Sequence, residues 1–121
     1  MFLLSRIKAW LESKFAIPLD SKFVFSKKDF VTTDFSLGIE FLNDDKTSME
    51  FVIKIFMKYF DLNKNDATVA MLICHEFDSV VIPVDSAERG DQVVQSVIEE
   101  ARRNRYPFEC KLISNERSGS D

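Results

Sequence analysis

The stretch FSLGIEFLNDDKTSMEFVIKIFMKYF, residues 35–60, joins a strand pattern to a helix pattern through a polar turn. Apolar residues alternate with small or polar ones over residues 35–42, which is the period of a half-buried strand. Asparagine and aspartate dominate residues 43–46, and this composition predicts a turn. These residues therefore predict a strand, a turn and a helix in succession, and the other segments are interpreted around this unit.

The first turn of residues 48–60 predicts a helix. Thr47 and Glu50 have the spacing of a capping box, in which each side chain bonds the backbone of the other. The β-branched residues of this segment also fit strand alternation, so periodicity alone leaves both alternatives open. The cap and the length of the segment favour the helix.

The remaining elements are predicted from periodicity: helices over 2–15 and 86–105, and strands over 22–26, 67–74, 80–84 and 108–112. The unbroken apolar run 67–74 is typical of a central strand that is covered on both faces. Polar connections are expected between 26 and 35 and over 61–66. Pro83 is expected to stop its strand, and Gly90 to delay its helix to Asp91.

This order of elements predicts an α+β fold with two layers, in which helices pack mainly on one face of a mixed β-sheet. The length fits a single globular domain over residues 1–113, followed by a polar tail over 114–121 that is expected to be disordered. No apolar run approaches the roughly 20 residues of a membrane span. Cys74 and Cys110 lie in apolar runs and are expected to be reduced. A cytoplasmic location follows.

Phenylalanine is unusually frequent, with twelve of 121 residues, and is expected to build most of the core. An exposed pair of these rings would mark a contact surface. Between residues 61 and 100 there are nine acidic and two basic residues, a balance that repels phosphate and attracts basic proteins. Direct nucleic-acid binding is therefore disfavoured. The acids predicted to bind a partner are Asp61, Asp66, Asp78, Asp85, Glu88 and Asp91.

The sequence contains no complete motif for binding a metal or a cofactor. Residues 61–72 begin like an EF-hand loop, but Asp66 and Leu72 stand where that loop needs glycine and glutamate. No glycine-rich phosphate loop can be built from the three glycines. No metal and no cofactor are predicted.

Catalytic patterns fail as well. His75 is the only histidine, and on the predicted strand 67–74 its neighbour Cys74 would point to the opposite face. Paired acids such as Glu99-Glu100 and Asp44-Asp45 are interpreted as solvated surface groups. No catalytic residue is predicted, and the protein is not expected to be an enzyme. A cysteine-dependent enzyme remains a third hypothesis, which would require a thiol of low pKa.

In size, acidity, single-domain layout and lack of a catalytic motif, the chain resembles the immunity proteins that bacteria make against their own secreted toxins, including those of contact-dependent growth inhibition. The resemblance implies a monomer that binds one basic protein, a cognate toxin domain such as a nuclease, in a one-to-one complex and blocks its active or substrate-binding surface. No contact with membranes is expected, because the polar face of the predicted helix 2–15 is short and of mixed charge. The alternative is a class I type III secretion chaperone, which is also small, acidic and α+β, but dimeric.

Overall fold

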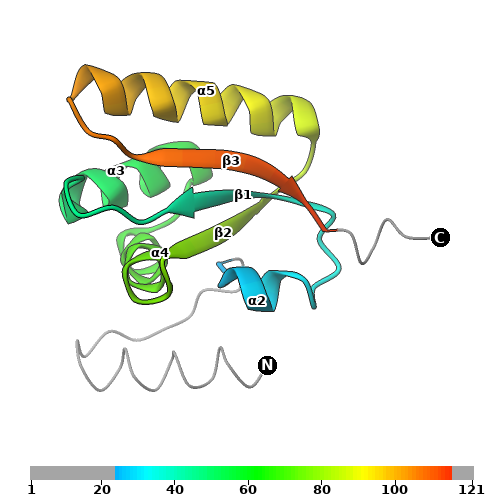
Figure 1. Cartoon of the computed structure of the whole chain (residues 1–121). Coiled ribbons are helices and arrows are strands. Elements are labelled where there is room, and N and C mark those ends of the chain that lie inside the picture. Colours follow the sequence, from blue (N-terminus) through cyan, green and yellow to red (C-terminus); the bar gives the residue numbers. More distant parts are fainter. Residues whose placement is uncertain (1–23, 116–121) are drawn as a thin grey trace.

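The computed structural model describes residues 24–115 (Figure 1). In chain order these residues form α2 (Lys27–Phe30), β1 (Leu37–Leu42), α3 (Met49–Phe60), α4 (Lys64–Phe77), β2 (Ser79–Val84), α5 (Ala87–Arg103) and β3 (Glu109–Ser114). The predicted helix over 2–15 and residues 116–121 of the predicted tail lie outside this range. Within it, no helix is long and apolar enough to cross a lipid bilayer.

β1 is the central strand of a sheet with the order β2–β1–β3, and both pairings are antiparallel. Phe41 of β1 lies opposite Val80 on one side and Cys110 on the other. The predicted α+β fold with two layers is confirmed. The sheet is antiparallel rather than mixed, because the segment predicted to be a further central strand is a helix.

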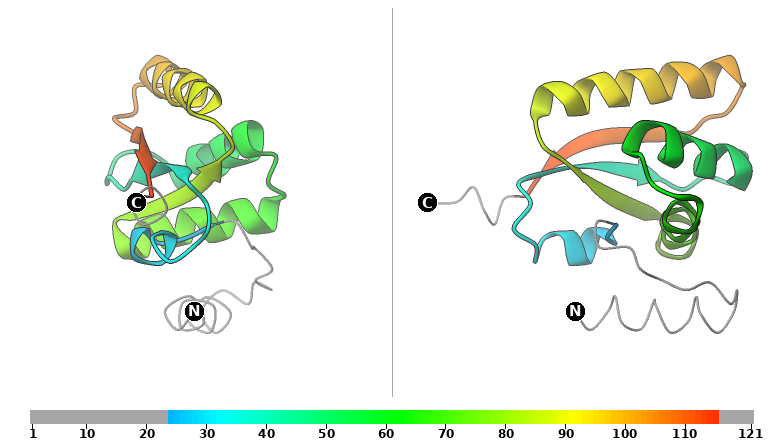
Figure 2. Two further views of the ribbon diagram at one scale, coloured as in Figure 1. Left: turned by 90° about the vertical axis from the view of Figure 1, so that its right-hand side faces the viewer. Right: turned by 180° about the vertical axis from the view of Figure 1, so that it is seen from behind.

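The two faces of the sheet are covered differently. Side chains alternate along a strand, and Ile39 and Phe41 pack into the main core with α3, α4 and α5 (Figure 2). Gly38 and Glu40 lie on the other face, where Phe30 of α2 approaches Gly38. Glu40 is buried there, 3.7–3.8 Å from the ammonium groups of Lys27 and Lys111. The strand predicted to be half-buried is therefore covered on both faces.

The core is built around phenylalanine, as predicted. The ring of Phe41 packs edge-on against Phe56 and Phe60, at centroid distances of 4.9 and 5.6 Å, and stacks on Phe108 at 5.6 Å. Three of these four rings are fully buried, and Phe60 is half-buried. Such ring pairs stabilise a core by about 0.5–1.5 kcal/mol beyond their buried area.

The helix predicted over 48–60 is confirmed, but Ser48 caps it. The Ser48 hydroxyl accepts a hydrogen bond from the Phe51 amide at 3.1 Å, while the hydroxyl of Thr47 donates to Asp44 instead. The helix ends at Asp61, which adopts a left-handed conformation with φ of 55°.

The prediction of a strand over 67–74 is wrong, because these residues belong to α4. Asn63 caps α4 by accepting a hydrogen bond from the Asp66 amide at 2.8 Å. Seven residues of α4 are buried, from Ala67 to Cys74. A helix that is covered on most sides has no polar face, so its sequence has the continuous apolar pattern of a buried strand. The loop predicted over 61–66 is correspondingly short.

The other predicted elements need smaller corrections. α5 begins at Ala87, and Gly90 lies inside it, where a Cβ atom would come within 2.6 Å of Leu112. Pro83 lies within β2 and does not stop it. β2 is an edge strand of the sheet, where a residue without an amide hydrogen is tolerated.

Residues before β1 contain more structure than predicted. Of the strand predicted over 22–26, Phe25 forms an isolated antiparallel bridge with Val81, with two backbone hydrogen bonds of 2.7 and 3.0 Å. Residues 22 and 23 lie outside the described range. The connection expected to be irregular contains α2, which Ser26 caps by accepting a hydrogen bond from the Asp29 amide.

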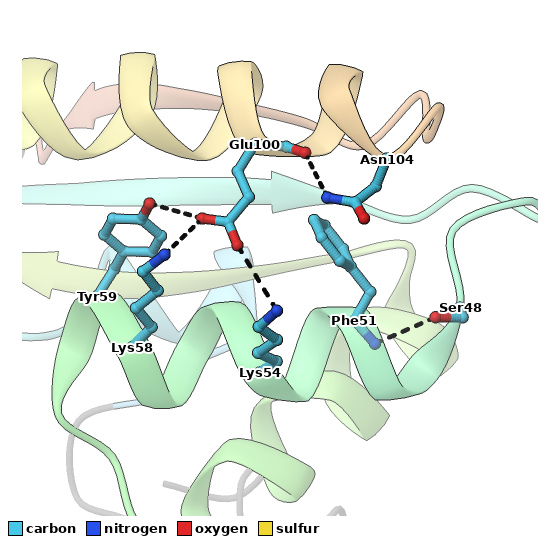
Figure 3. A network of polar contacts seen from close by, with 7 residues as sticks. All are labelled: Ser48, Phe51, Lys54, Lys58, Tyr59, Glu100 and Asn104. Atoms are coloured by element: carbon cyan, nitrogen blue, oxygen red, sulfur yellow. Dashed lines mark hydrogen bonds and ion pairs between the residues drawn. The ribbon is translucent and has the colours of Figure 1, made fainter.

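α5 is joined to α3 by the carboxylate of Glu100 (Figure 3), which is buried and not the solvated surface group that the sequence predicted. The Lys58 ammonium and the Tyr59 hydroxyl donate to Glu100 at 3.0 and 2.8 Å, and the Lys54 ammonium lies 4.0 Å away. Burial raises the pKa of Glu100, but these hydrogen bonds and positive charges outweigh burial. The pKa therefore lies below its ordinary value of 4.5.

Candidate ligand-binding site

A cavity of about 240 Å³ opens where β1 ends, α3 and β3 begin and α4 ends. It is lined by Asn43, Asp44, Asp45, Thr47, Met49, Val52, Met71, Cys74, His75 and Phe108. The polar members come from the 43–47 loop and from the last turn of α4. The apolar members come from α3, α4 and the start of β3. The cavity thus has a polar part and an apolar part.

The 43–47 loop is held in shape by Asp44. Its carboxylate accepts hydrogen bonds from the backbone amides of Lys46 and Thr47, at 2.8 and 2.7 Å, and from the Thr47 hydroxyl at 2.8 Å. Burial raises the pKa of Asp44, but these bonds and the charge of Lys46 outweigh burial and leave the pKa below its ordinary value. Asp44 is therefore an anion whose acceptor positions are largely used by its own loop.

The loop is also fastened to α4. The Asn43 amide donates to the carbonyl of Asp78, the residue that ends α4, at 2.9 Å. The side chains of Asn43, Asp45 and His75 are exposed at this edge of the cavity. An amide, a carboxylate and an imidazole therefore lie around the same opening, and each can accept a hydrogen bond.

α4 brings Met71, Cys74 and His75 to the same wall, because residues three and four apart share one face of a helix. The prediction that Cys74 and His75 point to opposite faces is wrong, since it assumed a strand. His75 lies in the last turn of α4, where it is exposed and lines the cavity. The sequence interpretation of Asp44 and Asp45 as ordinary solvated surface acids is also incomplete, because both line the cavity.

The Cys74 thiol belongs to the apolar wall. Its Sγ atom lies 3.5 Å from the carbonyl oxygen of Phe41, and the residue is 3% exposed. Burial, with smaller effects from nearby carboxylates, raises the pKa of Cys74 to about 12. Burial raises the pKa of Cys110 to about 12 as well, and both thiols are free. Neither cysteine has the low pKa that the hypothesis of a cysteine-dependent enzyme requires.

The interior of the cavity is apolar and firmly supported. Val52, Met71 and Phe108 are each at most 7% exposed, whereas Met49 stands at the rim and is 53% exposed. Phe108 rests on the ring of Phe41 in the aromatic core. Small-molecule sites commonly combine such an interior with a few polar groups that fix orientation. This cavity suits a ligand with an apolar side chain next to a positively charged hydrogen-bond donor.

The six acids predicted to bind a partner are spread over the molecule. Asp61 and Asp66 lie at the connection from α3 to α4, Asp78 ends α4, and Asp85, Glu88 and Asp91 lie at the start of α5. Asp66 and Asp78 are separated by about 18 Å along α4, at 1.5 Å per residue. The six residues therefore do not form one cluster. None of them lines the cavity, and only Asp78 contacts a lining residue, through the hydrogen bond from Asn43. Their role in binding a partner stays a prediction.

The family profile described as "ATP-dependent Clp protease adaptor protein ClpS" matches residues 38–111. The chain belongs to the ClpS family. All ten residues that line the cavity fall within the matched segment. The match also spans all of β1 except its first residue, all of α3, α4, β2 and α5, and the first half of β3.

Individual ClpS proteins are similar over the same region. The ClpS of Caulobacter sp. (strain K31) is 38% identical over 71 residues, which are 59% of this chain and 65% of that protein. The ClpS of Methylococcus capsulatus (strain Bath) is 39% identical over 71 residues, 59% of this chain and 67% of that protein. Both are named ATP-dependent Clp protease adapter proteins. The aligned region covers slightly less than two thirds of the length of the first of these ClpS relatives.

A solved ClpS structure has the same fold. Agrobacterium tumefaciens ClpS2, bound to L-phenylalaninamide, superposes with a TM-score of 0.63 and 20% sequence identity. The superposition covers 68% of this chain and 99% of that structure. The superposition therefore takes in almost the whole of that ClpS2 chain.

ClpS membership overturns three predictions. The resemblance to immunity proteins of contact-dependent growth inhibition is wrong, and so are the function of neutralising a toxin and the basic toxin domain as partner. The alternative of a type III secretion chaperone is wrong too. Small size, acidity and missing catalytic motifs are shared by many binding proteins, so this profile carried no information about the ligand. Five of the ten lining residues lie close together in the sequence, and these are Asn43, Asp44, Asp45, Thr47 and Met49.

Proposed function

We propose that this protein is a substrate adaptor that binds the free amino-terminal residue of a polypeptide in the cavity and delivers the polypeptide to an ATP-dependent Clp protease. The observation that carries the proposal is the division of the cavity into a polar rim and an apolar interior. An amino-terminal residue has matching parts: an α-ammonium group, a side chain and a single peptide bond leading away. The proposed substrates have a bulky hydrophobic residue at position one.

In this proposal the polar rim receives the α-ammonium group. The exposed side chains of Asn43, Asp45 and His75 supply acceptors there, and the anionic Asp44 adds negative charge. A protonated amine offers three donors, and hydrogen bonds between charged groups are about twice as strong as neutral ones. A residue inside a chain has no ammonium group. The rim would thus bind the amino-terminal residue of a polypeptide in preference to residues inside the chain.

The apolar interior receives the side chain of the first residue. Val52, Met71, Cys74 and Phe108 are buried, and the thiol of Cys74 is neutral. Burying a large apolar side chain contributes about 1.5–3 kcal/mol, whereas a charged side chain would lose its hydration there. The ligand of Agrobacterium ClpS2 supports this view, because L-phenylalaninamide has a free α-amino group, a phenyl ring and an amide in place of the next peptide bond.

The adaptor role implies no chemistry on the substrate. We propose that the protein is not an enzyme, and the high pKa of both thiols agrees with this. A cytoplasmic location is proposed on the two free, buried cysteines, since oxidising compartments favour disulfides. The proposed protein partner is the Clp protease named in the family description. The acids at the start of α5 remain candidates for such a contact, because they lie away from the cavity.

Isothermal titration calorimetry with matched peptides tests the proposal. A peptide that begins with phenylalanine followed by alanine should bind. An isomer that begins with alanine followed by phenylalanine should bind far more weakly. Acetylation of the first peptide should raise Kd about 100-fold, because the loss of charged hydrogen bonds costs about 1.5–3 kcal/mol each. Equal affinity for the free and acetylated peptides would contradict the proposal.

A further inference from the structure

The turn from α5 to β3 contributes Phe108 to the cavity and contacts the start of α3, beside the rim, through Tyr106. Phe108, at the end of this turn, forms part of the interior. Tyr106, two residues earlier, packs its ring on Phe51 of α3 at a centroid distance of 4.9 Å. Its hydroxyl donates to the Ser48 hydroxyl at 3.2 Å. Ser48 in turn caps α3 between two lining residues, Thr47 and Met49 (Figure 3).

Arg102 fixes the course of this turn from the last turn of α5. Its Nη1 atom donates to the carbonyl oxygens of Tyr106 and Phe108, at 2.9 and 3.0 Å. Its Nη2 atom pairs with the carboxylate of Glu109. The guanidinium therefore holds the backbone on both sides of Pro107, a residue that has no amide hydrogen of its own to donate.

The turn needs this support because its backbone is unusual. Arg105 adopts a left-handed conformation with φ of 63°, which costs a residue with a side chain about 1 kcal/mol. The turn begins with backbone hydrogen bonds from Arg105 to Arg102 and from Tyr106 to Ala101. Beyond Tyr106, the hydrogen bonds that hold the turn to α5 come from the Arg102 side chain. The planar fork of arginine suits this task, whereas a lysine ammonium on the same backbone is a point charge without that geometry.

We propose that Arg102 and Tyr106 are positioning residues for ligand binding: Arg102 sets the place of Phe108 in the interior, and Tyr106 sets the start of α3 at the rim. Neither residue lines the cavity. The inference rests on the proposed function, since it assumes that the cavity binds an amino-terminal residue. It adds that affinity depends on a surface arginine outside the cavity.

The test compares Arg102→Lys with Arg103→Lys, a matched change at the neighbouring exposed arginine. Affinities for L-phenylalaninamide and L-leucinamide are measured by calorimetry, well below the melting temperature of each variant. Arg102→Lys should raise Kd for phenylalaninamide at least threefold and for leucinamide less, because a planar ring contacts more of the displaced Phe108. Arg103→Lys should leave both values unchanged.

The ratio of the two affinities separates positioning from mere stability. A destabilised but folded protein loses the same fraction of binding-competent molecules for every ligand, so the ratio stays constant. Tyr106→Phe removes only the hydroxyl that contacts Ser48 and provides a second variant, for which we expect Kd to rise about twofold for both amides although urea unfolding shows the variant to be fully folded at the temperature of the titration, so that a smaller folded fraction cannot account for the rise. Unchanged affinity in both Arg102→Lys and Tyr106→Phe would overturn the inference. Failure of the unaltered protein to bind either amide would instead overturn the proposed function.

Discussion

Glu100 joins α5 to α3 through a carboxylate that is 5% exposed and paired with Lys58, Tyr59 and Lys54. Replacing a group in such a buried network leaves its partners without an acceptor, whereas exposed ion pairs contribute little. The two lysine ammonium groups reach toward solvent and can be hydrated after the change. The contribution of Glu100 should therefore come mainly from its buried oxygen atoms.

Glu100→Gln should lower the free energy of unfolding by about 1 kcal/mol at pH 7, since the amide keeps an acceptor but loses the charge. The pKa of Glu100 is lower in the folded than in the unfolded chain, so its stabilisation is present above the ordinary value of 4.5 and is lost as pH falls through the folded pKa. The difference between the two proteins in urea unfolding should shrink between pH 7 and pH 3. Glu99→Gln, at the exposed neighbour, should change stability by less than about 0.5 kcal/mol. A difference that stays constant over this range would refute the role of the charge.

At the scale of elements, Gly38 and Gly90 differ in how much space their neighbours leave for a side chain. A Cβ atom on Gly38 of β1 would lie 2.6 Å from Val81 and 3.1 Å from two ring atoms of Phe30, both fully buried. A Cβ atom on Gly90 of α5 would meet the flexible end of Leu112, at 2.6 Å, and Val84 at 3.4 Å. Only the first site has neighbours that cannot move away.

Gly38→Ala should therefore destabilise the protein by about 1–3 kcal/mol through overpacking. Gly90→Ala should cost much less, because alanine gains up to about 1 kcal/mol of helix propensity that offsets the displacement of Leu112. Urea unfolding of both variants at one pH measures the comparison. Equal losses of stability would show that the rigid contact at Gly38 does not decide the outcome.

Elements whose apolar and polar residues alternate could be predicted from the sequence. β1, α5 and β3 have such a pattern, whereas α3 was predicted from its cap and its length. The structure has all four within a few residues of the predicted ranges. α4 could not be predicted in this way because its buried residues surround the helix. Asn63 at its start was the available signal, since asparagine is a typical N-cap residue.

At the scale of the molecule, the cavity depends on contacts between segments far apart in the sequence. The 43–47 loop was predicted as a turn, but nothing local shows that His75 and Phe108 lie beside it. The incorrect prediction of a strand over 67–74 also hid the cavity, because a strand places Cys74 and His75 on opposite faces. The resemblance to immunity proteins failed for a related reason: composition describes a surface as a whole and not the few residues that meet at one opening.

The methionine side chains provide the most direct measurement. Met49 and Met71 line the cavity at its rim and in its interior, whereas Met57 is an exposed residue of α3 that does not line it. In protein labelled with ¹³C at the methionine methyl groups, titration with L-phenylalaninamide should shift the NMR signals of Met49 and Met71, because a phenyl ring would lie beside them. The signal of Met57 should stay in place. Binding that leaves Met49 and Met71 unshifted would contradict the assignment of this cavity as the site for an amino-terminal residue.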